Sequence, residues 1–233
     1  MKMKQERILI AGIPSIIYGE KSDKAYLFVH GQNGNKEEAE SFARIVSENG
    51  WQVLSIDLPE HGERKNETGR FYPWMIVPEL QKTADYMNSR WKRMALRATS
   101  IGAWFSMLAF QDKHIEKSLF VSPILDMDHL IENMMQWAGV TKDELEAKKI
   151  IPTNFGQTLS WEYYLYAKQN PIPVWDSDTK VLYGSKDNLT ERYIVDEFVE
   201  HFHCGLTVME NGEHWFHDKD QLAFLNKWEQ ENG

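Results

Sequence analysis

The stretch Arg93-Met-Ala-Leu-Arg-Ala-Thr-Ser-Ile-Gly-Ala-Trp-Phe105 joins an apolar run, which stops at a serine, to the start of a helix-like segment. Ala98 lies two positions before Ser100, and Gly102 lies two positions after it. This spacing approximates Gly-x-Ser-x-Gly, the pattern of a nucleophile elbow on a tight turn between strand and helix. A serine that merely caps a helix gives the same residues, so the rest of the chain has to discriminate between the two.

Length and composition indicate one globular domain. The 233 residues suffice for a large α/β domain with a buried core. No linker, internal repeat or low-complexity tract interrupts the sequence, so we expect a single domain over residues 1–233. The chain is 42% hydrophobic and 26% charged, which is normal for a soluble globular protein.

Charge and cysteine content restrict the partners and the compartment. The formal net charge is -9, which argues against a nucleic-acid partner because such binding depends on Lys and Arg. Cys204 is the single cysteine, which excludes an internal disulfide and a zinc site built on paired cysteines. The expectation is therefore a reducing compartment, the cytoplasm.

The N-terminal residues superficially resemble a signal peptide, because lysines precede an apolar run. Glu6 and Arg7 stand before that run and Pro14 soon interrupts it, so we interpret it as a first strand. No apolar run approaches the roughly 18 residues that a membrane span requires.

The chain beyond the N-terminus alternates between buried strands and helices. Lys24–His30 and Trp51–Leu58 are apolar runs, and residues 36–49 between them have helical spacing that ends at Gly50. This βαβ unit predicts a parallel sheet. The other expected elements are two strands over 7–19 with a turn near 12–15, helices over 76–90, 188–202 and 222–228, and strands over 117–123, 179–187 and 205–210.

Residues 126–170 lack the rhythm of strands and are rich in Met, Trp and Tyr. We expect a small helical cap inserted into the domain, over a pocket. The aromatic side chains equally suit packing against the sheet, and they are also consistent with a homodimer interface.

Three chemically suitable side chains follow buried strands: Ser100, Asp187 and His214. The ends of parallel strands gather at one edge of a sheet, so residues distant in sequence converge there. Their order along the chain, Ser then Asp then His, is that of an α/β-hydrolase triad.

Four motifs beside the elbow carry a family resemblance: Phe-Val-His-Gly-Gln-Asn-Gly from Phe28, Ile-Asp-Leu-Pro-Glu-His-Gly from Ile56, Tyr-Gly-Ser-Lys-Asp from Tyr183 and Gly-Glu-His-Trp-Phe from Gly212. With them most of the chain resembles the α/β-hydrolase superfamily, in its lipase, esterase and serine-aminopeptidase-like branch. The resemblance implies an α/β fold with a mostly parallel central sheet flanked by helices. It also implies Ser100 as the nucleophile, His214 as the base and Asp187 as the acid that orients it.

The resemblance further implies an oxyanion hole from the backbone N–H groups of Gln32 and Ile101. It favours His214 over His217, which lies three residues later, because His214 fills the Gly-x-His-x-Phe position. Asp126 and Asp128 are alternatives for the acid, since some relatives place it after the preceding strand.

Asp57 and the remaining histidines are expected to have structural roles rather than catalytic or metal-binding ones. We expect Asp57 to buttress the loop beside the sheet, and the resemblance implies that His30 and His61 hold loops by hydrogen bonds. His201, His203 and His217 match no strong metal-ligand spacing, so no metal and no cofactor are expected. The loop after His30 lacks the glycines of a dinucleotide fingerprint and the Gly-Lys-Ser/Thr of a phosphate loop.

The sequence thus predicts a serine hydrolase that cleaves an acyl bond of a small molecule, with a carboxylic ester as the first choice. A thioesterase, a small amidase or a peptidase would use the same residues. Ala98, where glycine is usual, also leaves open a hydrolase-like binding protein without catalysis.

Overall fold

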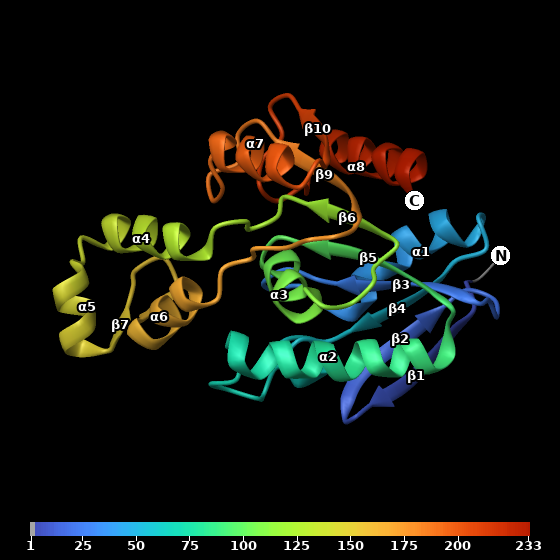
Figure 1. Ribbon diagram of the computed structural model, residues 1–233, viewed down its shortest axis with the longest axis horizontal. Helices are drawn as coiled ribbons and strands as arrows, with labels where there is room; N and C mark the ends of the chain where they lie inside the picture. Colours follow the sequence, from blue (N-terminus) through green and yellow to red (C-terminus); the bar gives the residue numbers. More distant parts are fainter. Residues whose placement is uncertain (1–2) are drawn as a thin grey trace.

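The computed structural model describes residues 3–233, in which a central sheet lies between two layers of helices (Figure 1). Eight strands of this range form the sheet in the order β1-β2-β4-β3-β5-β6-β9-β10. Strand β2 is antiparallel to β1 and β4, whereas all other neighbours are parallel. The strands are β1 (Gln5–Ile10), β2 (Ile13–Tyr18), β3 (Lys24–Val29), β4 (Gln52–Ile56), β5 (Arg93–Thr99), β6 (Lys117–Val121), β9 (Asp178–Gly184) and β10 (Gly205–Met209).

The helices divide between the two faces of the sheet and a separate cap. They are α1 (Ala39–Ser47), α2 (Pro73–Arg90), α3 (Ile101–Phe110), α4 (Met127–Ala138), α5 (Lys142–Lys148), α6 (Trp161–Gln169), α7 (Arg192–His201) and α8 (Lys219–Asn232). Phe42 of α1 and Trp228 of α8 belong to one buried cluster. Leu80 of α2, Phe105 of α3 and Phe198 of α7 belong to the other. Helices on both faces explain the near-continuous apolar sequences of the central strands.

The carboxyl ends of the parallel strands face the cap, which is residues 126–170 (Figure 1). Four loops leave this edge: the β3 loop (residues 30–35), the turn from β5 to α3 at Ser100, the β9 loop (residues 185–191) and the β10 loop (residues 210–218). The predicted parallel sheet therefore brings these loops together at one edge.

The cap is less purely helical than the sequence predicts. Besides α4, α5 and α6 it contains an antiparallel hairpin of β7 (Ile150–Pro152) and β8 (Thr158–Ser160). Ile151 pairs with Leu159, which is buried. Strands of three residues are too short to produce a recognisable alternation, so no pattern in the sequence predicts them.

Several predicted boundaries need correction. The first turn lies at Ala11 and Gly12, which have φ values of 50° and 90°, rather than at residues 12–15. Helix α2 begins three residues earlier than predicted, with Pro73 at its first position, where its missing N–H is not needed. Helix α7 begins only at Arg192, because residues 185–191 form the β9 loop. Helix α1 ends at Ser47, and Gly50 lies beyond its C-cap.

Candidate active site

Ser100 occupies the turn between β5 and α3 with φ 52° and ψ -124°. This left-handed conformation is uncommon for a residue with a side chain and is typical of strained functional turns. Small neighbours are needed for a steric reason: a Cβ at Gly102 would lie 2.5 Å from the carbonyl oxygen of His30. Ala98 is fully buried in β5, so the methyl group in place of the usual first glycine fits there.

The structure brings Ser100, His214 and Asp187 together in one hydrogen-bonded chain. The distance from Ser100 Oγ to His214 Nε2 is 2.8 Å, and the distance from His214 Nδ1 to Asp187 Oδ2 is 2.7 Å. The Asp187 side chain is fully buried, whereas that of His214 is 13% exposed. With Nδ1 donating to the carboxylate, Nε2 is free to accept the serine proton.

The β9 loop fixes the second oxygen of Asp187. Asp187 Oδ1 accepts hydrogen bonds from the backbone N–H groups of Leu189, at 2.8 Å, and Thr190, at 3.1 Å. A Cβ at Gly184 would lie 2.5 Å from the carbonyl oxygen of Gly212, so glycine lets the β9 and β10 loops approach each other. This close approach puts His214 within reach of Asp187.

The β3 loop lies directly against the serine. A Cβ at Gly31 would lie 3.2 Å from Ser100 Cβ, so the next residue, Gln32, follows immediately beside the nucleophile. Ile101 is the first residue of α3, where a backbone N–H has no intrahelical acceptor. Over residues 3–233 neither amide, Gln32 nor Ile101, donates to a protein acceptor. The Gln32 side chain donates to Gln157 Oε1 of the cap at 3.3 Å.

Two histidines hold the β3 loop in place. His30 Nδ1 lies 2.7 Å from the carbonyl oxygen of Gly31, and its Nε2 accepts from the backbone N–H of Leu58 at 3.1 Å. His61 Nε2 accepts from the backbone N–H of Asn33 at 2.9 Å. Burial lowers the pKa of His30 to about 4, so its ring is neutral and serves both as donor and acceptor. These contacts agree with the predicted structural role of both histidines.

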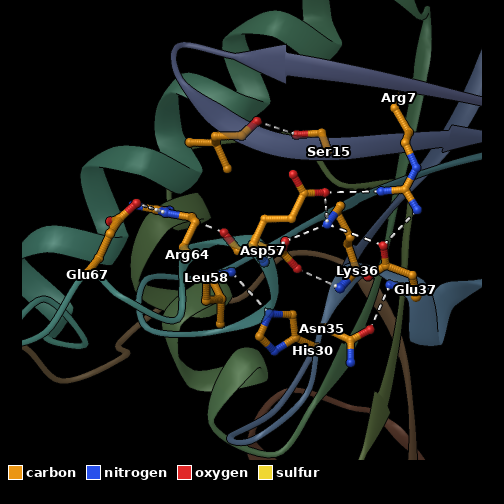
Figure 2. A network of polar contacts seen from close by, with 12 residues as sticks. Arg7, Ser15, His30, Asn35, Lys36, Glu37, Asp57, Leu58, Arg64 and Glu67 are labelled. Atoms are coloured by element: carbon orange, nitrogen blue, oxygen red, sulfur yellow. Dashed lines mark hydrogen bonds and ion pairs between the residues drawn. The ribbon is translucent and has the colours of Figure 1, made fainter.

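A buried ion pair lies behind the same loop (Figure 2). Lys36 Nζ is 2.6 Å from Asp57 Oδ2, and the two side chains are 1% and 0% exposed. Asp57 also accepts from the backbone N–H groups of Lys36, at Oδ1, and Glu63, at Oδ2. A Cβ at Gly62 would lie 2.1 Å from Asp57 Oδ1, so glycine leaves the space that the carboxylate fills. Asp57 thus joins the β3 loop to the segment after β4.

The competing residues lie elsewhere. Asp126 Oδ1 accepts from the backbone N–H of His129 and caps α4. Asp128 lies beside Asp126, and burial together with that neighbour raises its pKa. His217 Nδ1 contacts the carbonyl oxygen of Trp215 at 2.7 Å. Over the same residue range no group of three His, Cys, Asp or Glu is placed to hold a metal ion, and no helix is long and apolar enough to cross a bilayer.

Aromatic side chains connect the cap to the core next to the serine. Trp104, one helical turn after Ser100, stacks on Tyr163 of α6 with ring centroids 5.9 Å apart. Tyr163 also contacts Tyr72 and Trp74 at the start of α2. Burial raises the pKa of Tyr163 well above its usual value. Through Tyr163, this cluster packs the cap against the core.

A cavity of about 170 Å³ adjoins this cluster, lined by Trp104, by cap residues such as Asp128, and by Leu125 and Ile172, which flank the cap. Ile124, one residue before this lining, donates its N–H to the carbonyl oxygen of Ser100 at 3.2 Å. A larger cavity of about 320 Å³ lies where β5 and β6 begin, and neither cavity is lined by Ser100, Asp187 or His214.

No pattern in the sequence singles out Lys36, Thr190 or Gln157. Their partners depend on strand register and on the cap hairpin, which no local pattern encodes. A lysine directly after a conspicuous glycine-rich loop was the one available signal for Lys36.

Comparisons with known proteins agree with the fold. No family model matches the sequence, and neither does any curated protein. Among solved structures, Est1E from Butyrivibrio proteoclasticus with bound ferulic acid has a TM-score of 0.76 at 16% identity and covers 97% of each chain. The Pyrococcus furiosus esterase Pf2001 has a TM-score of 0.66 at 18% identity, covering 99% of this chain and 90% of the other. The thioesterase domain from the curacin biosynthetic pathway has a TM-score of 0.63 at 14% identity, covering 98% and 99%.

With the sheet order and the edge described above, these similarities show that the chain has the α/β-hydrolase fold. The predicted fold class is confirmed.

Proposed function

We propose that this protein is a serine hydrolase that cleaves carboxylic esters through an acyl-enzyme on Ser100. The observation that carries the proposal is the unbroken hydrogen-bonded chain from Ser100 Oγ through His214 to Asp187. A serine hydroxyl becomes a useful nucleophile only when a base receives its proton, and this chain supplies such a base. The similar solved structures include an esterase and a thioesterase domain, which supports hydrolysis of acyl bonds.

In the proposed mechanism, Ser100 Oγ attacks the carbonyl carbon of the ester while His214 Nε2 takes the hydroxyl proton. Asp187 stabilises the imidazolium that forms. The tetrahedral intermediate then breaks its bond to the alcohol oxygen, which leaves with the proton from His214. Water, activated by the same histidine, releases the carboxylic acid and restores the serine.

The tetrahedral intermediate carries a negative oxygen, which the N–H groups of Gln32 and Ile101 would stabilise. Support comes from the position of the β3 loop against Ser100 and from the start of α3, where the helix dipole favours a negative charge. Such a pair of fixed donors stabilises the transition state by several kcal/mol, and removing one donor costs about 3 kcal/mol of that stabilisation.

The cavity beside Trp104 is our candidate space for one part of the substrate. Its volume of about 170 Å³ is close to that of protein cavities that bind benzene. Small aryl or short acyl esters are therefore the first substrates to test. Ferulic acid, bound in the similar Est1E structure, is an aromatic carboxylic acid and belongs to the product class of such a reaction.

A thioester is the second candidate substrate, favoured by the similarity to the thioesterase domain. The same acyl-enzyme would form, with a thiol as the leaving group. Parallel kcat/KM measurements on an ester and a thioester with the same acyl group decide between the two.

The experiment is intact-mass spectrometry after treatment with a fluorophosphonate. We expect one adduct on the wild type and none on Ser100→Ala. Ser122→Ala is the matched control, because Ser122 is a buried serine with a φ of 44° at the end of the neighbouring strand β6. This variant should label like the wild type. Labelling of Ser100→Ala, or an unlabelled but folded wild type, would overturn the assignment, and the latter would favour a non-catalytic binding protein.

A further inference from the structure

Two hydrogen bonds join the cap to the β9 loop, which contains Asp187. Glu191 Oε1 accepts hydrogen bonds from His129 Nε2 at 3.0 Å and from Asn133 Nδ2 at 2.8 Å. His129 and Asn133 are four residues apart and lie on the same side of α4. The other oxygen, Oε2, is buried and has no hydrogen-bond partner among residues 3–233, so the side-chain contacts of the carboxylate with α4 are made through Oε1.

Glu191 is also rigidly connected to the acid. The preceding residue, Thr190, donates its N–H to Asp187 Oδ1 and its hydroxyl to the carbonyl oxygen of Pro123, at 3.1 Å each. Its own carbonyl accepts from the Tyr183 hydroxyl at 2.9 Å. A displacement of Glu191 would therefore pull on the residue that orients Asp187.

We propose that Glu191 is a positioning residue, which ties helix α4 of the cap to the orientation of the acid Asp187. The inference rests on the proposed serine hydrolase mechanism, because Asp187 matters there through His214. In this proposal the cap does more than cover the site, because it keeps Asp187 oriented toward His214. Neither Glu191 nor His129 touches the reacting atoms.

The contact is sensitive to protonation. The hydrogen bond that His129 donates to Glu191 raises the pKa of His129, with further contributions from the nearby carboxylates of Glu191, Asp126 and Glu132. Tyr193 of α7 also faces the ring, with its hydroxyl 3.4 Å from Nε2. Burial opposes ionisation of Glu191, but the hydrogen bonds from His129 and Asn133 outweigh it and lower the pKa of the carboxyl. The ion pair is thus complete below the raised pKa of His129 and weakens as the pH rises through it.

The test compares kcat, KM and pH profiles of aryl ester hydrolysis in three variants. Glu191→Ala and His129→Ala should lower kcat roughly three- to tenfold with little change in KM, the scale of a partly exposed charged hydrogen bond. His129→Gln retains a donor without a titrating proton, so it should restore kcat and remove the decline of kcat as His129 deprotonates. Lys148→Ala, which breaks the exposed pair with Glu144 elsewhere in the cap, is the control and should change nothing.

A measurement without turnover separates this inference from the proposed function. In a Ser100→Ala background, the imidazole NMR signals of His214 report how Asp187 is oriented. Glu191→Ala should shift the titration of His214, whereas Lys148→Ala should not. An unchanged His214 titration, or a His129→Gln variant that keeps the alkaline decline, overturns the positioning role. Failure of the fluorophosphonate to label Ser100 would instead overturn the hydrolase assignment.

Discussion

The β3 loop and the β9 loop both end a parallel strand at the same edge of the sheet, yet they are held in different ways. The β3 loop rests on buried groups: the neutral ring of His30 and the ion pair of Lys36 with Asp57. The β9 loop depends partly on the cap, through a contact in which the His129 and Glu191 side chains are 31% and 42% exposed. In the proposed mechanism, a fixed β3 loop would hold the oxyanion donors in one position, whereas the contact between the β9 loop and the cap would let docking of the cap influence Asp187.

The largest effect should come from breaking the buried ion pair. Lys36→Met leaves the Asp57 carboxylate without its cation in a dry environment, so we expect a loss of about 3–5 kcal/mol in the free energy of unfolding. Urea denaturation measures it. The control is Lys4→Ala, which breaks an exposed pair with Glu20 and should cost less than about 1 kcal/mol. Equal losses in the two variants would contradict the difference between buried and exposed support.

The second effect is a loss of stability at low pH. The unfolded chain protonates His30 near pH 6.5, whereas the folded chain resists protonation until about pH 4. The stability that neutral His30 contributes is therefore complete above pH 6.5 and is lost as the pH falls toward 4, by about 3 kcal/mol in total.

His30→Gln provides the comparison, because an amide keeps a donor and an acceptor without titrating in this range. Between pH 7 and pH 4 the wild type should lose about 3 kcal/mol more unfolding free energy than His30→Gln. Urea denaturation at each pH measures these free energies. If the free energy of unfolding changes with pH equally in both proteins, His30 is not buried as a neutral ring.

The third effect tests the β9 loop. Thr190→Val removes the hydroxyl that donates to Pro123 and leaves a buried carbonyl unsatisfied, so we expect a stability loss of about 1–3 kcal/mol. Because Thr190 also donates its N–H to Asp187, kcat for an aryl ester should fall roughly tenfold, an energy of about 1.4 kcal/mol. Thr190→Ser keeps the hydroxyl and should retain most of the activity. A Thr190→Val enzyme with the kcat of the wild type would separate this loop from catalysis.

The sequence predicted the parts of the molecule that obey local rules. Buried strands are rich in β-branched and apolar residues, and the close approaches near Ser100 and Asp187 require glycine, so both leave patterns in the sequence. These patterns predicted that Ser100, Asp187 and His214 lie at one edge of the sheet. The partners of Lys36, Thr190 and Glu191 could not be predicted, because they depend on how separate elements meet in space. The cap hairpin could not be predicted because its strands of three residues are too short to show an alternating pattern.

We expect the smallest effect at the contact between the cap and the β3 loop, which we compare with the contact between the cap and Glu191 of the β9 loop. Gln157 of the cap hairpin accepts from the Gln32 side chain at 3.3 Å in an exposed position. Because water replaces such a hydrogen bond readily, Gln157→Ala should change stability by less than about 0.5 kcal/mol. The β3 loop keeps its buried supports in this variant, so kcat should stay unchanged and KM should vary by no more than about twofold. A fall in kcat as large as that expected for Glu191→Ala would mean that the cap positions both loops, and the contrast between a fixed β3 loop and a β9 loop joined to the cap would disappear.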